Sequence, residues 1–181
     1  NPGEEVLIPD PGWPNYFQMT VLLGLKAVRY QLSIEHGMIP QISDMESKIT
    51  SKTRAIIINS PGNPTGAMIP KLRLVEILEM AKRHDLWVIS DEVYDEIYFN
   101  TPPISMAPMD NDGRVISVFS FSKTYAMTGW RVGYLVGTTE ITSLIMRSQE
   151  PTTSCVNSMA QKAAVAALTG PQECVQIMRE S

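Results

Sequence analysis

The sequence predicts an α/β fold with three layers, α/β/α, around a mostly parallel sheet. Apolar runs of strand length alternate with segments of helical periodicity along the chain, as in parallel sheets whose helices cover both faces. One run, Arg54-Ala55-Ile56-Ile57-Ile58-Asn59, is almost wholly apolar and rich in β-branched residues, which is typical of a strand buried on both faces. We therefore expect ligands to bind beyond the carboxyl ends of the strands.

The first part of the chain predicts two strands and two helices. Residues 5–9 form an apolar run, and the turn residues Pro9-Asp10-Pro11-Gly12 close it. A helix is expected from about residue 15 to Gly24, followed by a strand over 28–32. A short helix is expected over 43–49, with Ser43 as its N-cap and Glu46 three residues later.

The rest of the chain continues the alternation. After the strand at 54–59 and the turn residues 60–66, a helix is expected from Pro70 to His84, with Leu74, Leu78 and Ala81 on one face. The pattern then predicts strands over 86–90, 115–121 and 132–136, a Pro-rich surface loop over 101–108, and helices over 140–147 and 157–168.

Composition excludes several classes of protein. The chain has 181 residues, enough for one ordinary domain, a net charge of −4 and no basic stripe, so we expect no nucleic-acid partner. No apolar run approaches the roughly 20 residues of a membrane span. Cys155 and Cys174 have no metal-binding or redox spacing, so we expect no metal site and a reducing compartment, the cytoplasm. The first residues resemble a loop entering a strand, which predicts a fragment.

The chain has few charged residues and many methionines. Charged residues make up 19%, and there are 11 methionines. One interpretation is a core filled by methionine. The other is a surface that packs against a further domain or a second subunit.

One motif combines an amine, two hydroxyls and a cation. Ser120-Phe121-Ser122-Lys123 is followed eight residues after the lysine by Arg131. A lysine can condense with an aldehyde, while serine and arginine hold a phosphate. This combination suits pyridoxal phosphate, whose enzymes also need a carboxylate at the pyridine nitrogen.

Other candidate residues follow other predicted strands. Asp91 comes directly after the strand at 86–90 and could hold the ring nitrogen, with Tyr94 three residues on; Asn63 offers an amide donor in a stiff turn. The ends of parallel strands share one edge, so Asn63, Asp91 and Lys123 are expected in one crevice. Trp13 could stack on a flat cofactor or plug the edge of the domain. Each residue alone also fits an ordinary turn, loop or surface position.

Together these residues resemble the class I and II aminotransferases of the aspartate aminotransferase superfamily, which use pyridoxal phosphate on fold type I. The matching segments span residues 1 to about 137 in the family's order. They are Asn1 to Val6, Trp13, Asn63-Pro64-Thr65-Gly66, Asp91 with Tyr94, Ser120-Phe121-Ser122-Lys123, and Gly129-Trp130-Arg131-Val132-Gly133.

The resemblance implies a role at each position. Lys123 would bind the cofactor covalently and move a proton. Asp91 would bond the pyridine nitrogen, and Tyr94 and Asn63 the phenolic oxygen. The phosphate would be held by Ser120, Ser122 and Arg131, and the ring would be stacked on Trp13.

The resemblance also implies what lies outside the sequence. Residues 1–181 would be a partial large domain. The family's phosphate loop upstream of Asn1 and its C-terminal small domain, with an arginine for the substrate carboxylate, would be missing. The tract Thr152-Thr153-Ser154-Cys155 departs from the family's usual residues. Family members are homodimers with sites at the subunit boundary, so a homodimer is expected.

The leading hypothesis is an aminotransferase acting between an amino acid and a 2-oxo acid. One alternative is a pyridoxal-phosphate lyase on the same scaffold, since the same cofactor residues serve both. Others are a non-catalytic domain of a regulator that senses pyridoxal phosphate or another effector, and an inert truncated product. Acidic, aromatic and aliphatic amino acids all remain candidate substrates.

Overall fold

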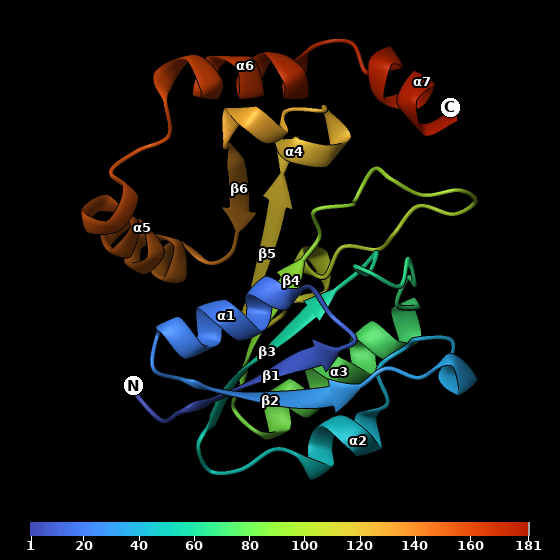
Figure 1. The fold of residues 1–181 in the computed structure, drawn as a ribbon, viewed down its shortest axis with the longest axis vertical. Helices are drawn as coiled ribbons and strands as arrows, with labels where there is room; N and C mark the ends of the chain where they lie inside the picture. Colours follow the sequence, from blue (N-terminus) through green and yellow to red (C-terminus); the bar gives the residue numbers. More distant parts are fainter. Residues whose placement is uncertain (181) are drawn as a thin grey trace.

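The protein is an α/β domain with one six-stranded sheet, in the order β2-β1-β3-β4-β5-β6. The computed structural model describes residues 1–180. The five strands β2, β1, β3, β4 and β5 run parallel, and β6 runs antiparallel to β5 (Figure 1). The predicted fold class, a mostly parallel sheet with helices on its faces, is confirmed. The strands are β1 (Glu5–Asp10), β2 (Lys26–Gln31), β3 (Thr53–Asn59), β4 (Trp87–Asp91), β5 (Val115–Ser120) and β6 (Gly133–Val136).

The helices connect the strands and cover the sheet. The α-helices are α1 (Pro14–Leu22), α2 (Ile42–Ser47), α3 (Lys71–Arg83), α4 (Phe121–Thr124), α5 (Thr139–Thr153), α6 (Ser158–Thr169) and α7 (Glu173–Glu180). Three short 3₁₀ turns are η1 (Ile34–His36), η2 (Ala107–Met109) and η3 (Thr128–Trp130).

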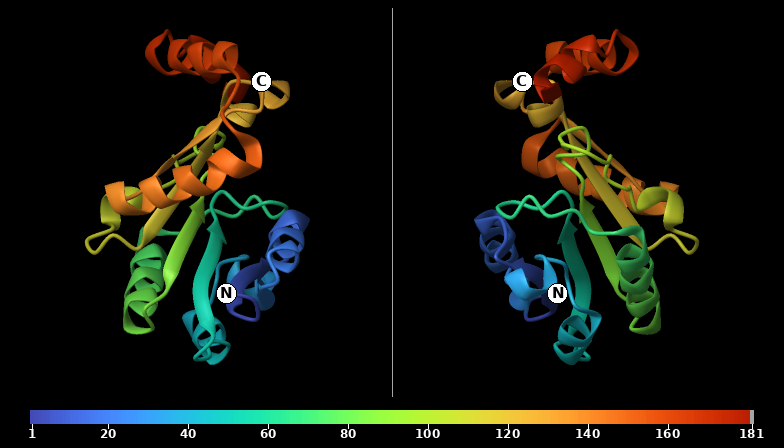
Figure 2. Two further views of the ribbon diagram at one scale, coloured as in Figure 1. Left: turned by 90° about the vertical axis from the view of Figure 1, so that its left-hand side faces the viewer. Right: turned by 90° about the vertical axis from the view of Figure 1, so that its right-hand side faces the viewer.

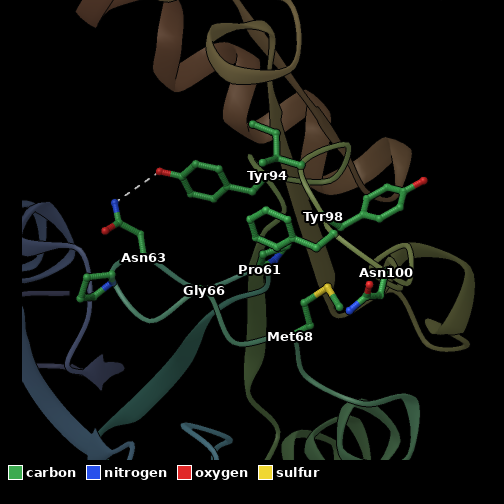
Figure 3. A pocket seen from close by; sticks show the side chains of 11 residues that line it. Pro61, Asn63, Gly66, Met68, Tyr94, Tyr98 and Asn100 are labelled. Carbon is green, nitrogen blue, oxygen red and sulfur yellow. Dashed lines mark hydrogen bonds between the residues drawn. The ribbon is translucent and has the colours of Figure 1, made fainter. Parts of the chain in front are cut away.

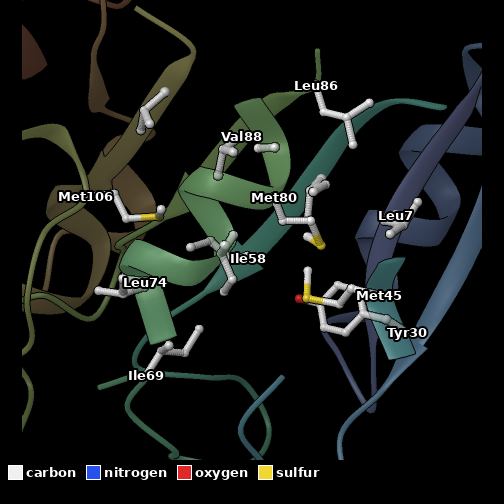
Figure 4. Packing of buried hydrophobic residues seen from close by; sticks show 14 residues of the cluster. Leu7, Tyr30, Met45, Ile58, Ile69, Leu74, Met80, Leu86, Val88 and Met106 are labelled. Carbon is white, nitrogen blue, oxygen red and sulfur yellow. The ribbon is translucent and has the colours of Figure 1, made fainter. Parts of the chain in front are cut away.

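Alternation along the strands separates two faces of the sheet. In β3, Ala55 and Ile57 pack with Tyr16 of α1, whereas Ile56 and Ile58 join the larger core with α2 and α3 (Figure 4). Figure 2 shows α1 and α3 on opposite sides of β3. The strand is thus buried on both faces, which explains its continuous apolar run.

The α3 helix shows why the predicted helical pattern is reliable. Leu74, Ile77, Met80 and Ala81 are buried, at the spacing of three and four residues that one helical face requires. The predicted span of 70–84 agrees with the observed helix within about a residue at each end.

The strand order creates a switch point at β1. Its two neighbours are β2 on one side and β3 on the other, so the connections leave β1 in opposite directions. A crevice forms at such a point beyond the carboxyl ends of the strands. The segments that follow β1 and β3 contain Trp13 and Asn63, respectively.

Several predicted element bounds are wrong. Helix α2 begins at Ile42, and Gln41 precedes it without a side-chain cap, so Ser43 is not the N-cap. Helix α5 extends past the predicted end at 147 and includes Pro151. A proline near the end of a helix removes only one donor, and the Thr152 hydroxyl bonds back to the carbonyl oxygen of Ser148 at 3.1 Å.

Helices α6 and α7 lie beyond the carboxyl end of β5 (Figure 1). Ala160 and Ala164 of α6 pack with Phe121 and Val132 in a separate small core. Within residues 1–180, no helix has the length and hydropathy that a membrane crossing requires.

Candidate active site

The predicted site residues lie at the carboxyl edge of the sheet. Asn63 is in the turn after β3, and Lys123 is in α4, directly after β5. Asp91 is the last residue of β4, paired with Asn59 and Val118 on its two sides. The prediction that Asp91 is the first residue beyond the strand is therefore wrong by one position. Since β3, β4 and β5 are parallel neighbours, the structure brings their three ends together.

The carboxylate of Asp91 is held by two donors. The hydroxyl of Tyr16 donates to Oδ2, and the backbone N–H of Val93 donates to Oδ1 at 3.2 Å. Burial raises the pKa of Asp91 above its usual value, although these two hydrogen bonds act in the opposite direction. Among the described residues, no salt bridge involves Asp91, so this partly buried acid is suited to a cationic ligand.

Asn59 fixes the turn of Asn63 against the end of β4. Its Nδ2 donates to the backbone oxygen of Asp91 at 3.0 Å, and its Oδ1 accepts from the N–H of Asn63 at 2.6 Å. Gly66 in the same turn has φ +68, a left-handed conformation that most side chains disfavour. The local sequence thereby holds Asn63 at a fixed position beside Asp91.

Tyr94 lies close to both Asn63 and Lys123. Nδ2 of Asn63 lies 3.4 Å from the Tyr94 hydroxyl (Figure 3). Nζ of Lys123 lies 6.0 Å from the centroid of the Tyr94 ring. Asn63 and Tyr94 also line a cavity of about 380 Å³. Donors from three separate segments thus meet in one place.

The serine and arginine residues lie between the last residue of β5 and the start of β6. Ser120 Oγ accepts from the N–H of Ser122 at 3.1 Å and caps α4. Ser120 pairs with Gly133 across the β5–β6 ladder, which brings Arg131 beside the start of α4. Arg131 is exposed and left-handed, with φ 52. Its Nη1 donates to the Thr128 carbonyl at 2.8 Å.

Trp13 is linked to Asp91 through Tyr16. The Trp13 and Tyr16 rings meet edge to face, 5.4 Å apart at 85°. Trp13 remains 39% exposed, so it does not seal the domain edge as a buried plug would. Trp13 directly precedes α1.

Three residues of this region were not predicted as part of it. Tyr16 and Asn59 contact Asp91 directly, and Glu92 is buried at 4% exposure on the opposite face of the segment. Tyr16 follows Trp13 by three residues at a helix start, a spacing that places both on one side. Asn59 is the only polar residue in the last five positions of β3. This polar residue at the end of an apolar strand was the feature of the sequence that could have assigned Asn59 to the site.

This donor set fits pyridoxal phosphate. The partly buried Asp91 carboxylate suits a protonated ring nitrogen, and the Asn63 amide and Tyr94 hydroxyl suit a phenolic oxygen. The Lys123 amine and the Arg131 cation match the aldehyde and the phosphate. Within residues 1–180, no group of histidine, cysteine and acidic side chains is arranged to hold a metal ion.

Comparisons with known proteins converge on one family. The family model described as aminotransferase class I and II matches residues 1–181. The aspartate/prephenate aminotransferase of Cereibacter sphaeroides is 38% identical over all of this chain. The aspartate aminotransferase of Pyrococcus abyssi is 41% identical over 92% of it.

Solved structures agree with the sequence relatives. A mutant aspartate aminotransferase of Thermus thermophilus has a TM-score of 0.95 at 32% identity, and an aromatic aminotransferase of Pyrococcus horikoshii has 0.94 at 40%. Each covers 99% of this chain, which in turn covers 48% and 49% of theirs. The chain likewise spans 46% and 43% of the two sequence relatives, about half their length.

Proposed function

The chain belongs to the class I and II aminotransferase family, and we propose that the protein containing it transfers an amino group between an amino acid and a 2-oxo acid with pyridoxal phosphate. The main observation in support is the meeting of Asp91, Asn63, Tyr94 and Lys123 at one edge of the sheet. An acid, two neutral donors and a primary amine are the groups that this chemistry needs.

The residues would hold the cofactor at four points. Asp91 would bind the protonated ring nitrogen, while Tyr94 and Asn63 would donate to the phenolic oxygen. Trp13 would stack on the ring. The phosphate would be bound by Ser120, Ser122 and Arg131, since charge-assisted hydrogen bonds favour arginine at phosphate oxygens.

When bound, pyridoxal phosphate supplies an aldehyde that condenses with amines and a ring that accepts electrons from the substrate's Cα–H bond. Lys123 Nζ would hold the aldehyde, and its amine would also serve as the base that accepts the proton from the substrate's Cα. Asp91 would keep the ring nitrogen protonated throughout. Tyr16 would keep Asp91 ionised, because its hydroxyl donates to the carboxylate.

We propose further that residues 1–181 form most of the large domain of a cytoplasmic homodimer. The chain's coverage of about half its relatives supports the first part. Large apolar side chains are exposed on α1 and α6, including Phe17, Leu22 and Val165, and supply a surface for further protein. Both cysteines are free thiols, in keeping with a reducing compartment.

A substrate panel on the full-length protein tests the proposal. The donors should include aspartate, an aromatic amino acid and alanine, each offered with 2-oxoglutarate and added pyridoxal phosphate. Formation of glutamate together with the matching 2-oxo acid supports amino transfer. Release of pyruvate and ammonia from a cysteine-like substrate, without any glutamate, would contradict it and indicate a lyase.

A further inference from the structure

Arg179 on α7 is bonded to a segment 83 positions earlier in the chain. Its Nε donates to the backbone oxygen of Glu96 at 2.9 Å, and its Nη2 pairs with the Glu96 carboxylate. Its Nη1 donates to the Tyr98 hydroxyl at 2.9 Å. The guanidinium carbon also lies 4.1 Å from the centroid of the Tyr98 ring. All three nitrogens of one side chain are thus engaged.

The segment that Arg179 holds lines the cavity beside Asn63 and Tyr94. Residues 97–100 contribute to the lining, opposite Pro61 and Met68 (Figure 3). Figure 3 shows the Tyr98 ring pointing away from Asn63. The Tyr98 hydroxyl therefore lies on the side of the segment where it accepts the hydrogen bond from Arg179 of α7. One side of the segment therefore faces the site and the other faces Arg179.

Little else fixes this segment. It belongs to no helix or strand. The N–H of Ile97 donates to the carbonyl of Tyr94 at 2.9 Å, and the Thr124 hydroxyl donates to Asp95 at 3.2 Å. Both contacts hold its first half. Arg179 adds the contacts at Glu96 and Tyr98, and Phe99 is 97% exposed.

The energetics favour a local role for Arg179. A partly exposed arginine–carboxylate pair contributes little to global stability, and the Arg179 side chain is 24% exposed. A planar guanidinium that bonds a carboxylate, a backbone oxygen and a phenol at once does fix geometry. The expected result of its loss is a mobile segment on an otherwise folded protein.

We propose that Arg179 is a positioning residue that holds residues 96–100 as a wall of the substrate cavity. It touches neither cofactor nor substrate, and it acts through Glu96 and Tyr98. This inference rests on the proposed aminotransferase function. Its consequence is that substrate binding depends on α7, although α7 contributes no residue to the cavity lining.

The test compares substitutions in the full-length protein. Arg179→Met removes all the polar contacts but keeps a similar apolar stem. Arg83→Met is the matched control, because Arg83 Nη2 bonds the Glu46 carboxylate at 2.7 Å between α3 and α2. Tyr98→Phe is the milder second variant, since it removes a single hydroxyl and keeps the ring.

Two readouts are needed. Chymotrypsin cleavage after Phe99 reports the mobility of the segment without any cofactor. Steady-state kinetics with the best amino donor separate KM from kcat. Arg179→Met should be cleaved about fivefold faster and should raise KM about fivefold, with kcat within about twofold of wild type. Tyr98→Phe should change both in the same direction by a smaller factor, and Arg83→Met should change neither.

The outcomes separate the two proposals. An inactive wild-type protein would contradict the proposed function. An active wild type with unchanged cleavage and unchanged KM in Arg179→Met and Tyr98→Phe would overturn the role of Arg179 alone. Faster cleavage with an unchanged KM would also overturn it, because Arg179 would then hold the segment without any effect on substrate binding.

Discussion

At the scale of single residues, the candidate site is built around a partly buried acid, Asp91, which pairs with no cationic side chain among the described residues. Asp91 keeps its position through a phenol and a backbone N–H. Both donors are uncharged, and the effect of burial exceeds that of their hydrogen bonds, so the pKa of Asp91 is still raised. A cationic ring nitrogen beside the carboxylate would offset that cost. The protein without cofactor therefore carries an electrostatic penalty at Asp91.

This penalty predicts a pH dependence of stability in the cofactor-free protein. The folded state binds the Asp91 proton more tightly than the unfolded chain, whose pKa is near 3.8. The free energy of unfolding should therefore fall as pH rises through this value to the raised folded pKa, and the loss should persist above it. Asp91→Asn lacks this proton, so its stability relative to wild type should increase over the same window. Urea denaturation at a series of pH values measures this difference, and a flat difference would refute the prediction.

Tyr16 offers a direct test of how Asp91 is held. A hydrogen bond to a charged group contributes about 1.5 kcal/mol or more, so Tyr16→Phe should lower kcat/KM about tenfold. Tyr30→Phe is the control, since the buried Tyr30 hydroxyl donates to the Ile57 carbonyl at 2.9 Å in the main core. It should lower stability by about 1 kcal/mol and leave kcat/KM unchanged. Equal kinetic losses in both variants would contradict a specific role for Tyr16.

The sequence could predict residue types but not all their partners. Lys123, Asp91 and Asn63 follow strands, so their convergence is a consequence of parallel topology. Tyr16 lies 75 positions from Asp91. Only the packing of α1 against the sheet brings the two together, and no local pattern encodes that distance.

At the scale of elements, Glu92 joins the strands that carry the site. Its Oε1 accepts from the hydroxyls of Ser90 at 2.8 Å and Ser117 at 2.7 Å, and from the N–H of Met106 at 3.2 Å. These donors belong to β4, β5 and the loop before η2. The carboxylate of Glu92 therefore fixes the end of β4 next to Asp91.

Removal of this acceptor should destabilise the fold. Glu92→Leu leaves three buried donors without a partner, which predicts a loss of about 3 kcal/mol or more. Glu92→Gln retains an oxygen that can accept from the same donors, so its loss should be below about 1 kcal/mol. Denaturant unfolding measures both. Similar stabilities for the two variants would show that the hydrogen bonds to Glu92 do not matter.

Element predictions succeeded where burial is strong and periodic. The strand predicted at 54–59 is buried along its apolar run. The α3 helix is buried at the spacing of three and four residues along one face. Helix α4 has four residues, too few for any period to appear. Helix α7 has one buried residue, Val175, and its Arg179 bonds Glu96, a contact between distant segments that no local pattern encodes.

At the scale of the whole molecule, the methionines lie both in the core and on the surface. Met45, Met80 and Met106 are fully buried in the main core, whereas Met146 and Met159 are 68% and 69% exposed. The core is therefore partly filled by methionine. Met146 and Met159 lie on α5 and α6, which contribute few buried residues.

This difference predicts unequal effects of alanine substitution. Met80→Ala opens a cavity in the main core and should cost about 2–5 kcal/mol. Met159→Ala should change the stability of the chain by less than about 0.5 kcal/mol. Thermal or urea unfolding of both variants measures the contrast. A large loss in Met159→Ala would indicate that α6 is covered by further protein.

The fold class could be predicted because alternation of strands and helices limits the choice of topology. The antiparallel direction of β6 and the strand order could not, since both depend on contacts between distant segments. The exposed apolar side chains on α1, α5 and α6 are a property of the folded chain. The composition indicates them only through its low fraction of charged residues.

The most direct test of the account is to locate the covalent attachment of the cofactor. Full-length protein incubated with pyridoxal phosphate is reduced with borohydride, digested and analysed by mass spectrometry. We predict a phosphopyridoxyl group on the peptide that contains Lys123, and its loss in Lys123→Ala. Attachment to another lysine, such as Lys71 or Lys162, or an unmodified Lys123 would contradict the account.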